Sequence, residues 1–187
     1  IVGNRDLTFS VVRYGNVMGS RGSVIPFFLE KAKHGSLPIT HKEMTRFNIT
    51  LKEGVNMVLW AIDNSKGGEI FVPKLPSYRV VDLAFAIGPN CKKEYNGTRP
   101  GEKIHEEMIT SSDSINTFDF GEYYAIIPEE FSGIVKNTRK IYFEEGLKFN
   151  KVEENFSYSS GNNPNFLDID SIRTLIKNNI DKDFKPF

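Results

Sequence analysis

The chain has 187 residues, and its 24 Lys and Arg are balanced by 24 Asp and Glu, so the formal net charge at pH 7 is zero. Such a chain offers no extended field of one sign, which argues against a nucleic-acid-binding protein and against attachment to an anionic membrane. Its single cysteine, Cys91, excludes an internal disulfide. No apolar run approaches the roughly 20 residues that a membrane helix needs. Together these features predict a cytoplasmic protein without a membrane segment.

The first predicted elements are a strand, a glycine-rich turn and a helix. Phe9, Val11 and Val12 form an apolar run that is typical of a strand buried on both faces, as in a parallel sheet. A helix follows from Ser23, with Pro26 in its first turn, where the missing N–H costs little. Ligands of open α/β sheets lie at the carboxyl ends of strands, and helix N-termini favour anions. We therefore expect a ligand site at this turn.

The turn itself has two interpretations. Gly15, Gly19 and Gly22 could form a degenerate dinucleotide fingerprint, but their spacing is not G-x-G-x-x-G. The acidic residue about 20 positions later would be Glu43, and no clear strand leads to it. A tight turn between strand and helix is the simpler interpretation.

Strands and helices continue to alternate along the chain. Residues 37–40 and 44–49 are expected to be extended, and Thr50 with Glu53 forms a capping box at the start of the clearest helix. Trp60 lies beside the apolar stripe of that helix and is expected to pack. The stripe, which should face the core, consists of Leu51, Val55, Val58, Leu59 and Ile62.

The later elements keep the same order. We expect strands over 69–73, 92–95 and 123–127, helices over 80–87 and 102–109, and a last helix capped by Asp168 or Asp170 with Ile172, Leu175 and Ile176 inward. Strands that alternate with helices predict the α/β class.

No catalytic set is visible in the sequence. His34, His41 and His105 are scattered, and the carboxylates near His105 do not make a metal site. Glu106 and Glu107 are most simply the surface of the predicted 102–109 helix, because adjacent residues point apart. We therefore expect no catalytic residue and no metal ligand in this chain, and a hydrolase has little support.

Three polar residues are candidate ligand contacts. The guanidinium groups of Arg46 and Arg99 are planar forks of donors that suit phosphate oxygens, and two of them on separate loops could clamp a diphosphate. On spacing alone, a structural ion pair for each arginine is favoured, such as Arg99 with Glu102. The amide of Asn16 could bond a sugar hydroxyl or the diphosphate, or form an Asx turn.

Five separated strings carry a resemblance to a known family. They are RYGNVMGSRGSVIPFF, MTRFNIT, GGEIFVPK, RPGEKIHEEMI and YSSGNN, and they fall between Phe9 and Leu167. In this order they resemble the inverting UDP-N-acetylglucosamine 4,6-dehydratases, which are extended short-chain dehydrogenase/reductases of the CapD-like polysaccharide-biosynthesis group. Met18 and Asn48 stand where valine or isoleucine and tryptophan are more typical, and both changes look tolerable.

The resemblance implies an α/β fold, the C-terminal part of an extended short-chain dehydrogenase/reductase Rossmann fold. Residues 1–34 and 66–75 would belong to the cofactor-domain sheet, and residues 35–65 and 76–187 mainly to the substrate lobe and tail. The glycine-rich cofactor loop and the catalytic tyrosine and lysine would precede Ile1. The surface expected to be exposed, which would make the chain alone poorly soluble, contains Val11, Val12, Phe27 and Phe28.

The resemblance also assigns roles to individual residues. Arg46 and Arg99 would contact the nucleotide diphosphate or ribose, and Glu102 would bond the ribose or orient Arg99. NADP, with NAD as the alternative, would be bound mainly by residues before Ile1. Its contacts in this chain would be Tyr14, Gly15, Asn16 and Val17. Besides Asn16, the further substrate contacts would be Ser20, Arg21, Val24, and, facing the uracil, Ile39 and Thr40.

The implied reaction is the loss of water from UDP-N-acetylglucosamine with inversion at C5. Hydride passes from C4 to the cofactor to give a 4-keto sugar, the C5 proton and the C6 hydroxyl leave as water, and hydride returns to C6. The product would feed nonulosonic (pseudaminic) acid or other surface-glycan synthesis, and the full-length enzyme would be a homo-oligomer. The chain alone should be inactive. A UDP-sugar 4-epimerase and a non-catalytic nucleotide-sugar-binding module remain alternatives.

Overall fold

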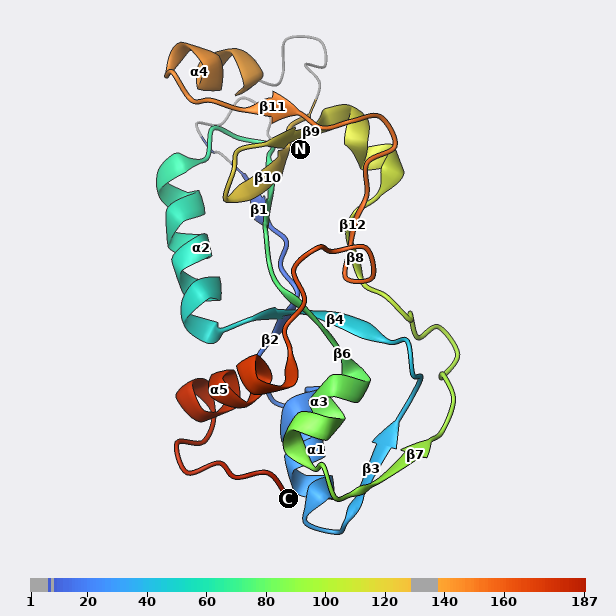
Figure 1. Cartoon of the computed structure of the whole chain (residues 1–187). Coiled ribbons are helices and arrows are strands. Elements are labelled where there is room, and N and C mark those ends of the chain that lie inside the picture. Colours follow the sequence, from blue (N-terminus) through green and yellow to red (C-terminus); the bar gives the residue numbers. More distant parts are fainter. Residues whose placement is uncertain (1–6, 8, 129–137) are drawn as a thin grey trace. The chain divides into compact units, whose positions relative to one another are not determined.

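The structure, a computed structural model, describes residue 7, residues 9–128 and residues 138–187 (Figure 1). The chain forms two compact units. Unit 1 comprises residues 1–14, 52–74 and 107–158, and unit 2 comprises residues 15–51, 75–106 and 159–187. Each unit is therefore assembled from three separate segments of the chain.

Unit 1 is built on a mixed sheet of short strands. Their order is β1 (Val11–Val12), β5 (Ile70–Pro73), β10 (Tyr123–Ile126), β9 (Thr117–Asp119) and β11 (Asn150–Lys151). β1 runs parallel to β5, and the other neighbours are antiparallel. The predicted strands in the regions of residues 9–12, 69–73 and 123–127 are thus confirmed. The unit also contains the 3-10 helix η1 (Ser111–Asn116), α4 (Thr138–Glu144) and β8 (Glu107–Ile109).

The core of unit 1 lies between this sheet and α2 (Leu51–Asn64). Trp60 on α2 meets the Phe71 ring edge-on, with ring centroids 5.2 Å apart, and lies 4.3 Å from the centroid of Tyr123. The predicted packing role of Trp60 is therefore confirmed.

A fully buried carboxylate fixes the turn before β5. Glu69 accepts hydrogen bonds from the Ser10 hydroxyl at 2.7 Å, from the backbone N–H groups of Lys66 and Gly67 at 2.6 and 2.8 Å, and from the Tyr142 hydroxyl at 2.7 Å. Burial and the nearby Glu69 charge raise the pKa of Tyr142, so it stays a donor. The buried carboxylate of Glu69 therefore has the hydrogen-bond donors that a buried charge requires.

Two predictions about buried faces in unit 1 are wrong. The α2 stripe expected to face the core is exposed: Leu51 68%, Val55 48%, Val58 39%, Leu59 56% and Ile62 69%. The helix packs instead through Gly54, Met57, Trp60 and Ala61. Phe9 and Val11 are 57% and 53% exposed, so the first strand is not buried on both faces, although Val12 packs against the core. A periodic stripe shows which residues share a face but not which face is covered.

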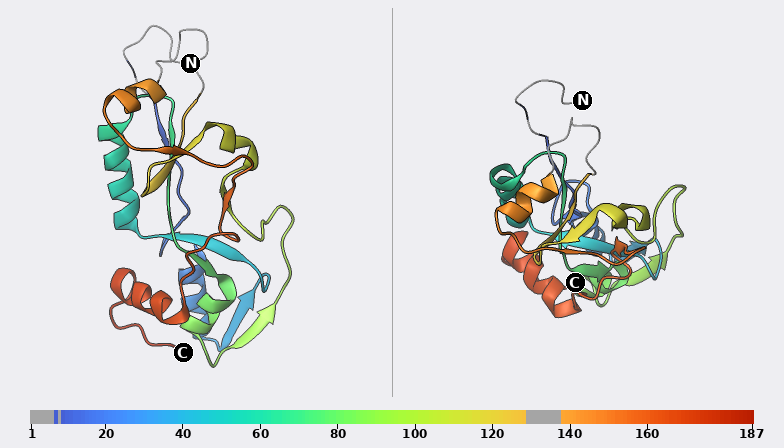
Figure 2. Two further views of the ribbon diagram at one scale, coloured as in Figure 1. Left: turned by 45° about the horizontal axis from the view of Figure 1, so that its top comes forward. Right: turned by 90° about the horizontal axis from the view of Figure 1, so that it is seen from above.

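Unit 2 contains two further small sheets. In one, β4 (Thr45–Ile49) pairs with β2 (Asn16–Val17) in parallel and with β6 (Ser77–Arg79) in antiparallel. In the other, β3 (Ser36–Ile39) and β7 (Lys92–Tyr95) run parallel, side by side in both views of Figure 2. The predicted extended pieces at 37–40, 44–49 and 92–95 are confirmed.

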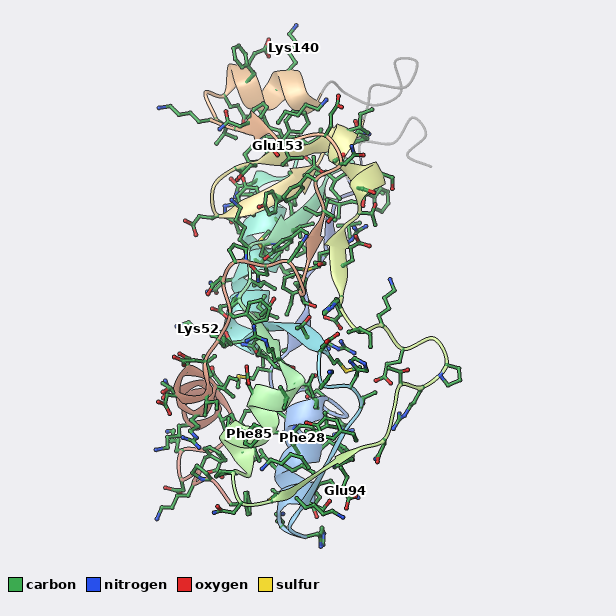
Figure 3. All side chains as sticks on the ribbon, turned by 45° about the vertical axis from the view of Figure 1, so that its right-hand side comes forward. Phe28, Lys52, Phe85, Glu94, Lys140 and Glu153 are labelled. Atoms are coloured by element: carbon green, nitrogen blue, oxygen red, sulfur yellow. The ribbon has the colours of Figure 1, made fainter. Side chains whose placement is uncertain are left out.

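Three helices cover these strands: α1 (Val24–Ala32), α3 (Val80–Ile87) and α5 (Ile169–Asn179). α3 packs against both α1 and α5. The Asp168 side chain accepts from the Ser171 backbone N–H at 2.8 Å, which confirms it as the N-cap of α5, and Ile172 and Ile176 are buried as predicted. Phe27 is 43% exposed as expected, whereas Phe28 is 1% exposed in the core, contrary to the prediction. Figure 3 labels Phe28 on α1.

The predicted helix over 102–109 is wrong, because residues 102–106 are irregular and β8 follows. Neighbouring groups take the backbone bonds that a helix would have used. The Ile104 carbonyl accepts from the Thr45 backbone N–H at 3.0 Å, and the Glu106 carbonyl accepts from that of Ser160 at 2.7 Å. Ser160 belongs to the turn that follows β12 (Tyr158–Ser159). Within the described ranges, no helix is long and apolar enough to cross a membrane.

Candidate functional site

Unit 2 contains a pocket of about 340 Å³ at the start of α1. Its lining comes from β2, the turn before α1, α1 itself, β3, the β3–β4 connection, β4, the start of α3 and the loop after β7. Six of the predicted substrate contacts lie in it: Asn16, Val24, Thr40, Arg46, Arg99 and Glu102. Residues far apart in the sequence therefore meet in one concave site, as is usual for a small-molecule pocket.

The N-terminus of α1 opens on this pocket. Gly22 reaches φ +78°, a conformation that side chains rarely adopt, and Ser23 is the N-cap residue. The hydroxyl oxygen of Ser23 is buried, yet it has no hydrogen-bond partner among the described residues. A helix start with free N–H groups carries a partial positive charge, and a buried hydroxyl without a partner costs stability. Both features suit an anionic or hydrogen-bonding ligand.

Arg99 brings the exposed positive charge of the pocket. Its backbone N–H donates to Oε2 of Glu102 at 3.1 Å, and its carbonyl accepts from the Glu102 backbone N–H at 3.0 Å. The Glu102 carboxylate thus closes a backbone turn that begins at Arg99. Among the residues that the structure describes, the Arg99 guanidinium forms no ion pair, so it is available to a ligand.

Arg46, in contrast, is committed to the protein. Its Nη1 donates to the carbonyls of Thr45 at 2.7 Å and Ile104 at 3.1 Å, and its Nη2 donates to that of Lys103 at 3.1 Å. Its Nε lies 3.5 Å from Oε1 of Glu106, and only 14% of the side chain is exposed. The structural ion pair that spacing favoured is present for Arg46, with Glu106 as the partner.

Glu106, which bonds the pocket residue Asn16, was missed by sequence reasoning, as was the Ser23 hydroxyl. With its amide nitrogen turned toward the carboxylate, Asn16 donates to Oε2 at 2.9 Å and to Oε1 at 3.0 Å. The backbone N–H of Phe47 also donates to the carboxylate. Burial raises the pKa of Glu106, while Arg46 and the Phe47 bond oppose the shift. The only sequence signal was its place in the string RPGEKIHEEMI.

The other predicted contacts do not line this pocket. Tyr14 belongs to unit 1, Ser20 and Arg21 are exposed, Val17 is half-buried in β2, and Ile39 is fully buried in the core. Gly15 has a packing reason to be glycine, because an added Cβ would lie 2.4 Å from Cβ of Phe47.

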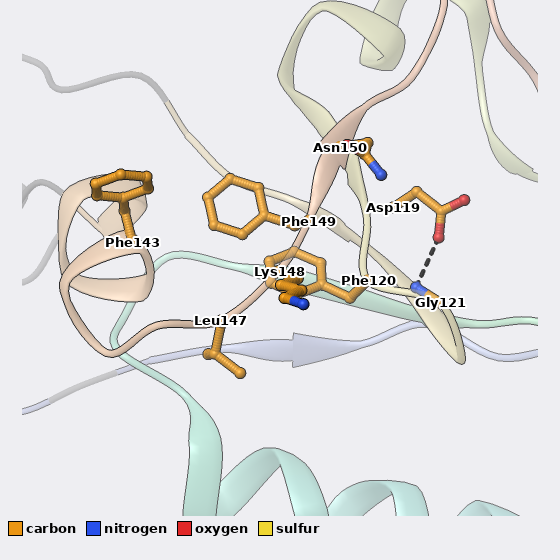
Figure 4. A pocket seen from close by; sticks show the side chains of 8 residues that line it. All are labelled: Asp119, Phe120, Gly121, Phe143, Leu147, Lys148, Phe149 and Asn150. Carbon is orange, nitrogen blue, oxygen red and sulfur yellow. Dashed lines mark hydrogen bonds between the residues drawn. The ribbon is translucent and has the colours of Figure 1, made fainter.

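Unit 1 has hollows of its own. One of about 630 Å³ lies beside β9 and β11, where Phe120, Phe143, Leu147 and Phe149 gather and the Asp119 carboxylate accepts from the Gly121 N–H at 2.8 Å (Figure 4). The rings of Phe120 and Phe149 stack with centroids 4.9 Å apart. Three phenylalanines line it, and none of the predicted site residues lies in it.

Comparison with known proteins decides the family. Residues 1–128 match the family described as polysaccharide biosynthesis protein. The chain belongs to this family. Over 166 residues it is 49% identical to the UDP-N-acetylglucosamine 4,6-dehydratase (inverting) of Campylobacter jejuni, covering 88% of this chain and 49% of that protein. Over 171 residues it is 41% identical to the UDP-glucose 4-epimerase of Rickettsia canadensis, covering 89% of this chain and 48% of that protein.

The chain also matches a solved structure, that of Pen from Bacillus thuringiensis, with a TM-score of 0.76 and 30% identity. The match covers 95% of this chain and 52% of that one. The predicted α/β class, of the Rossmann type found in short-chain dehydrogenase/reductases, is confirmed. The chain spans about half the length of the curated relatives that it matches.

Proposed function

We propose that this chain forms the nucleotide-sugar-binding part of a UDP-N-acetylglucosamine 4,6-dehydratase that inverts C5. The observation that carries the proposal is the pocket of unit 2, where six residues assigned by the resemblance come together. The 49% identical relative bears the name of this enzyme. The pathway would be the synthesis of pseudaminic acid or another surface glycan, in the cytoplasm.

The pocket offers each end of a sugar nucleotide a suitable partner. The α1 N-terminus, the Ser23 hydroxyl and the free Arg99 guanidinium suit the diphosphate, because charge-assisted bonds from guanidinium and helix N–H groups are strong. Thr40 and Pro38, at the end of β3, offer backbone groups and a hydroxyl for the base. Asn16 offers an amide to the sugar. The role of this chain is thus to hold and orient the substrate.

NADP, or NAD, is proposed as the cofactor from the resemblance. Of the four residues assigned to it, only Asn16 lines the pocket, and the glycine at position 15 is accounted for by contact with Phe47. The residues described here therefore fit the sugar nucleotide better than a dinucleotide. When bound, the cofactor would accept hydride from the sugar and return it. The division into a cofactor-domain part and a substrate lobe, and a homo-oligomeric assembly, are likewise proposals.

Incubation of the protein, expressed from its complete gene, with UDP-N-acetylglucosamine in deuterated water tests the activity. A 4,6-dehydratase gives a product lighter by one water with deuterium at C5. The alternative is a UDP-sugar 4-epimerase, which the names of the Rickettsia relatives favour. It would give UDP-N-acetylgalactosamine of unchanged mass, and that product alone would reject the dehydratase.

A further inference from the structure

Glu106 collects donors from two neighbouring strands of unit 2. Asn16 of β2 donates its amide N–H to both carboxylate oxygens, at 2.9 and 3.0 Å. From β4, Arg46 lies 3.5 Å away and the Phe47 backbone N–H donates. Glu106 is half-buried, with 32% of its side chain exposed, so these contacts define where its charge sits.

This arrangement fixes which atom Asn16 can offer to the pocket. A carboxylate only accepts hydrogen bonds, so the Asn16 amide turns its nitrogen toward Glu106 and leaves its oxygen for the ligand. A phosphate oxygen needs a donor, and it would also meet the negative charge of Glu106 nearby. A hydroxyl or an acetamido N–H of a sugar can donate to the Asn16 oxygen without that repulsion.

The hydrogen bonds and ion pair of Arg46 also argue against a phosphate next to Asn16. Three of its N–H groups bond the carbonyls of Thr45, Lys103 and Ile104, and its charge faces Glu106. This pair therefore contributes little net charge to the pocket, and Arg99 is the guanidinium left for a phosphate.

We propose that Glu106 is a positioning residue that holds the Asn16 amide as a hydrogen-bond acceptor, so that this part of the pocket selects a donor group of the sugar over a phosphate. The proposal rests on the proposed function, because it takes the pocket to bind a sugar nucleotide.

Calorimetric titration with UDP and with UDP-N-acetylglucosamine tests the proposal in the protein expressed from its complete gene. Glu106→Gln removes the charge that orients Asn16. The affinity for UDP-N-acetylglucosamine should fall about tenfold, the loss of roughly one good hydrogen bond, while the affinity for UDP stays within about twofold. Glu107→Gln, at the exposed neighbouring position, should change neither. Equal losses for both ligands, or no loss in Glu106→Gln, would overturn the proposal.

A second variant keeps the test decisive if Glu106→Gln does not fold. Asn16→Ala removes the acceptor and should show the same sugar-dependent loss, and unchanged affinity for UDP-N-acetylglucosamine in this variant would overturn the proposal. Where both fold, the double variant should bind no more weakly than Asn16→Ala, because Glu106 acts through Asn16. Additive losses would contradict that dependence. A wild type that binds neither ligand refutes the proposed function itself, whereas binding without the sugar-dependent difference refutes only the role of Glu106.

Discussion

Arg99 and Arg46 look alike in the sequence but differ in the structure. The Arg99 guanidinium is exposed and forms no ion pair within the described part of the chain, so Arg99→Ala should leave the free energy of unfolding unchanged. If it contacts the diphosphate, UDP affinity should fall roughly 10- to 150-fold, from about 1.5–3 kcal/mol. Arg99→Lys should restore only part of the UDP affinity, because the ammonium group of lysine cannot bond two phosphate oxygens as a guanidinium does. Lys42→Ala, which removes an exposed charge elsewhere in unit 2, is the control. An affinity of Arg99→Ala for UDP equal to that of wild type would show that Arg99 does not contact the diphosphate.

Arg46→Ala should instead destabilise the protein. The three carbonyls that it bonds would lose a charged donor, and Glu106 would lose its counter-ion. We expect the free energy of unfolding to fall by about 2–3 kcal/mol in urea denaturation. A variant that is as stable as wild type but cannot bind UDP would show that Arg46 serves the ligand rather than the fold.

The raised pKa of Glu106 gives a pH dependence with a definite sign. The folded chain binds the proton at a higher pH than the unfolded chain, so the contribution of Glu106 to stability grows as pH falls through the raised pKa and is lost as pH rises through it. Arg46 and Tyr78 face this carboxylate, and burial raises the pKa of Tyr78. Contributions from other groups cancel in a comparison with Glu106→Gln. Urea denaturation from pH 7 to pH 5 should show wild type gaining stability relative to Glu106→Gln, and a relative loss would contradict the assigned shift.

The Ser23 hydroxyl should favour UDP binding without stabilising the free protein. Its hydroxyl is buried without a partner among the described residues, so Ser23→Ala should leave the free protein equally stable or more stable, by up to about 1 kcal/mol. The same variant should bind UDP more weakly if the hydroxyl meets the diphosphate. Thermal melts with and without UDP separate the two effects, and a destabilised free protein would show that the hydroxyl has a structural partner.

At the level of elements, the sequence predicted most helices and strands but not every buried face. The 3.6-residue repeat of α2 identified the helix, yet Gly54 and Ala61, which lie outside that repeat, make the packed side together with Trp60. Residues 102–106 failed as a helix because Arg46, Thr45 and Ser160 bond their backbone groups, and such contacts with distant segments leave no local pattern.

The contact between β2 and β4 depends on glycine at position 15. An added Cβ would lie 2.4 Å from Cβ of Phe47, which is fully buried. Gly15→Ala should therefore lower the free energy of unfolding by about 1–3 kcal/mol, the usual cost of overpacking. Gly22→Ala meets no atom within 4 Å and should cost only the strain of its positive φ. A fully stable Gly15→Ala variant would contradict the packing explanation.

For the whole chain, the exposed apolar surface of unit 1 is the feature that we expect to cause self-association. Phe9 and Val12 share a hollow of about 650 Å³ with Val58 and Ile62 of the α2 stripe. An exposed apolar patch of this kind favours association. We expect the 187-residue chain to self-associate, and the pair Leu59→Lys with Ile62→Lys to reduce that association in light scattering without lowering stability, because both residues are exposed. A chain that is monomeric at high concentration without the substitutions would contradict this prediction.

The sequence predicted which residues meet at the site better than it predicted the contacts among them. The resemblance named six residues that the fold does bring together, and five of them, all but Thr40, lie in the strings that carry the resemblance. It could not identify Glu106 or the isolated hydroxyl of Ser23. Their importance depends on distances between strands and on missing partners, which only the folded chain defines.

A crystal structure of the protein with UDP-N-acetylglucosamine would decide whether the unit 2 pocket holds the sugar nucleotide. We expect the diphosphate at the N-terminus of α1, within hydrogen-bond distance of the Ser23 hydroxyl and the Arg99 guanidinium, and the sugar donating to the Asn16 oxygen. A ligand bound elsewhere, or a diphosphate placed against Glu106, would contradict this account.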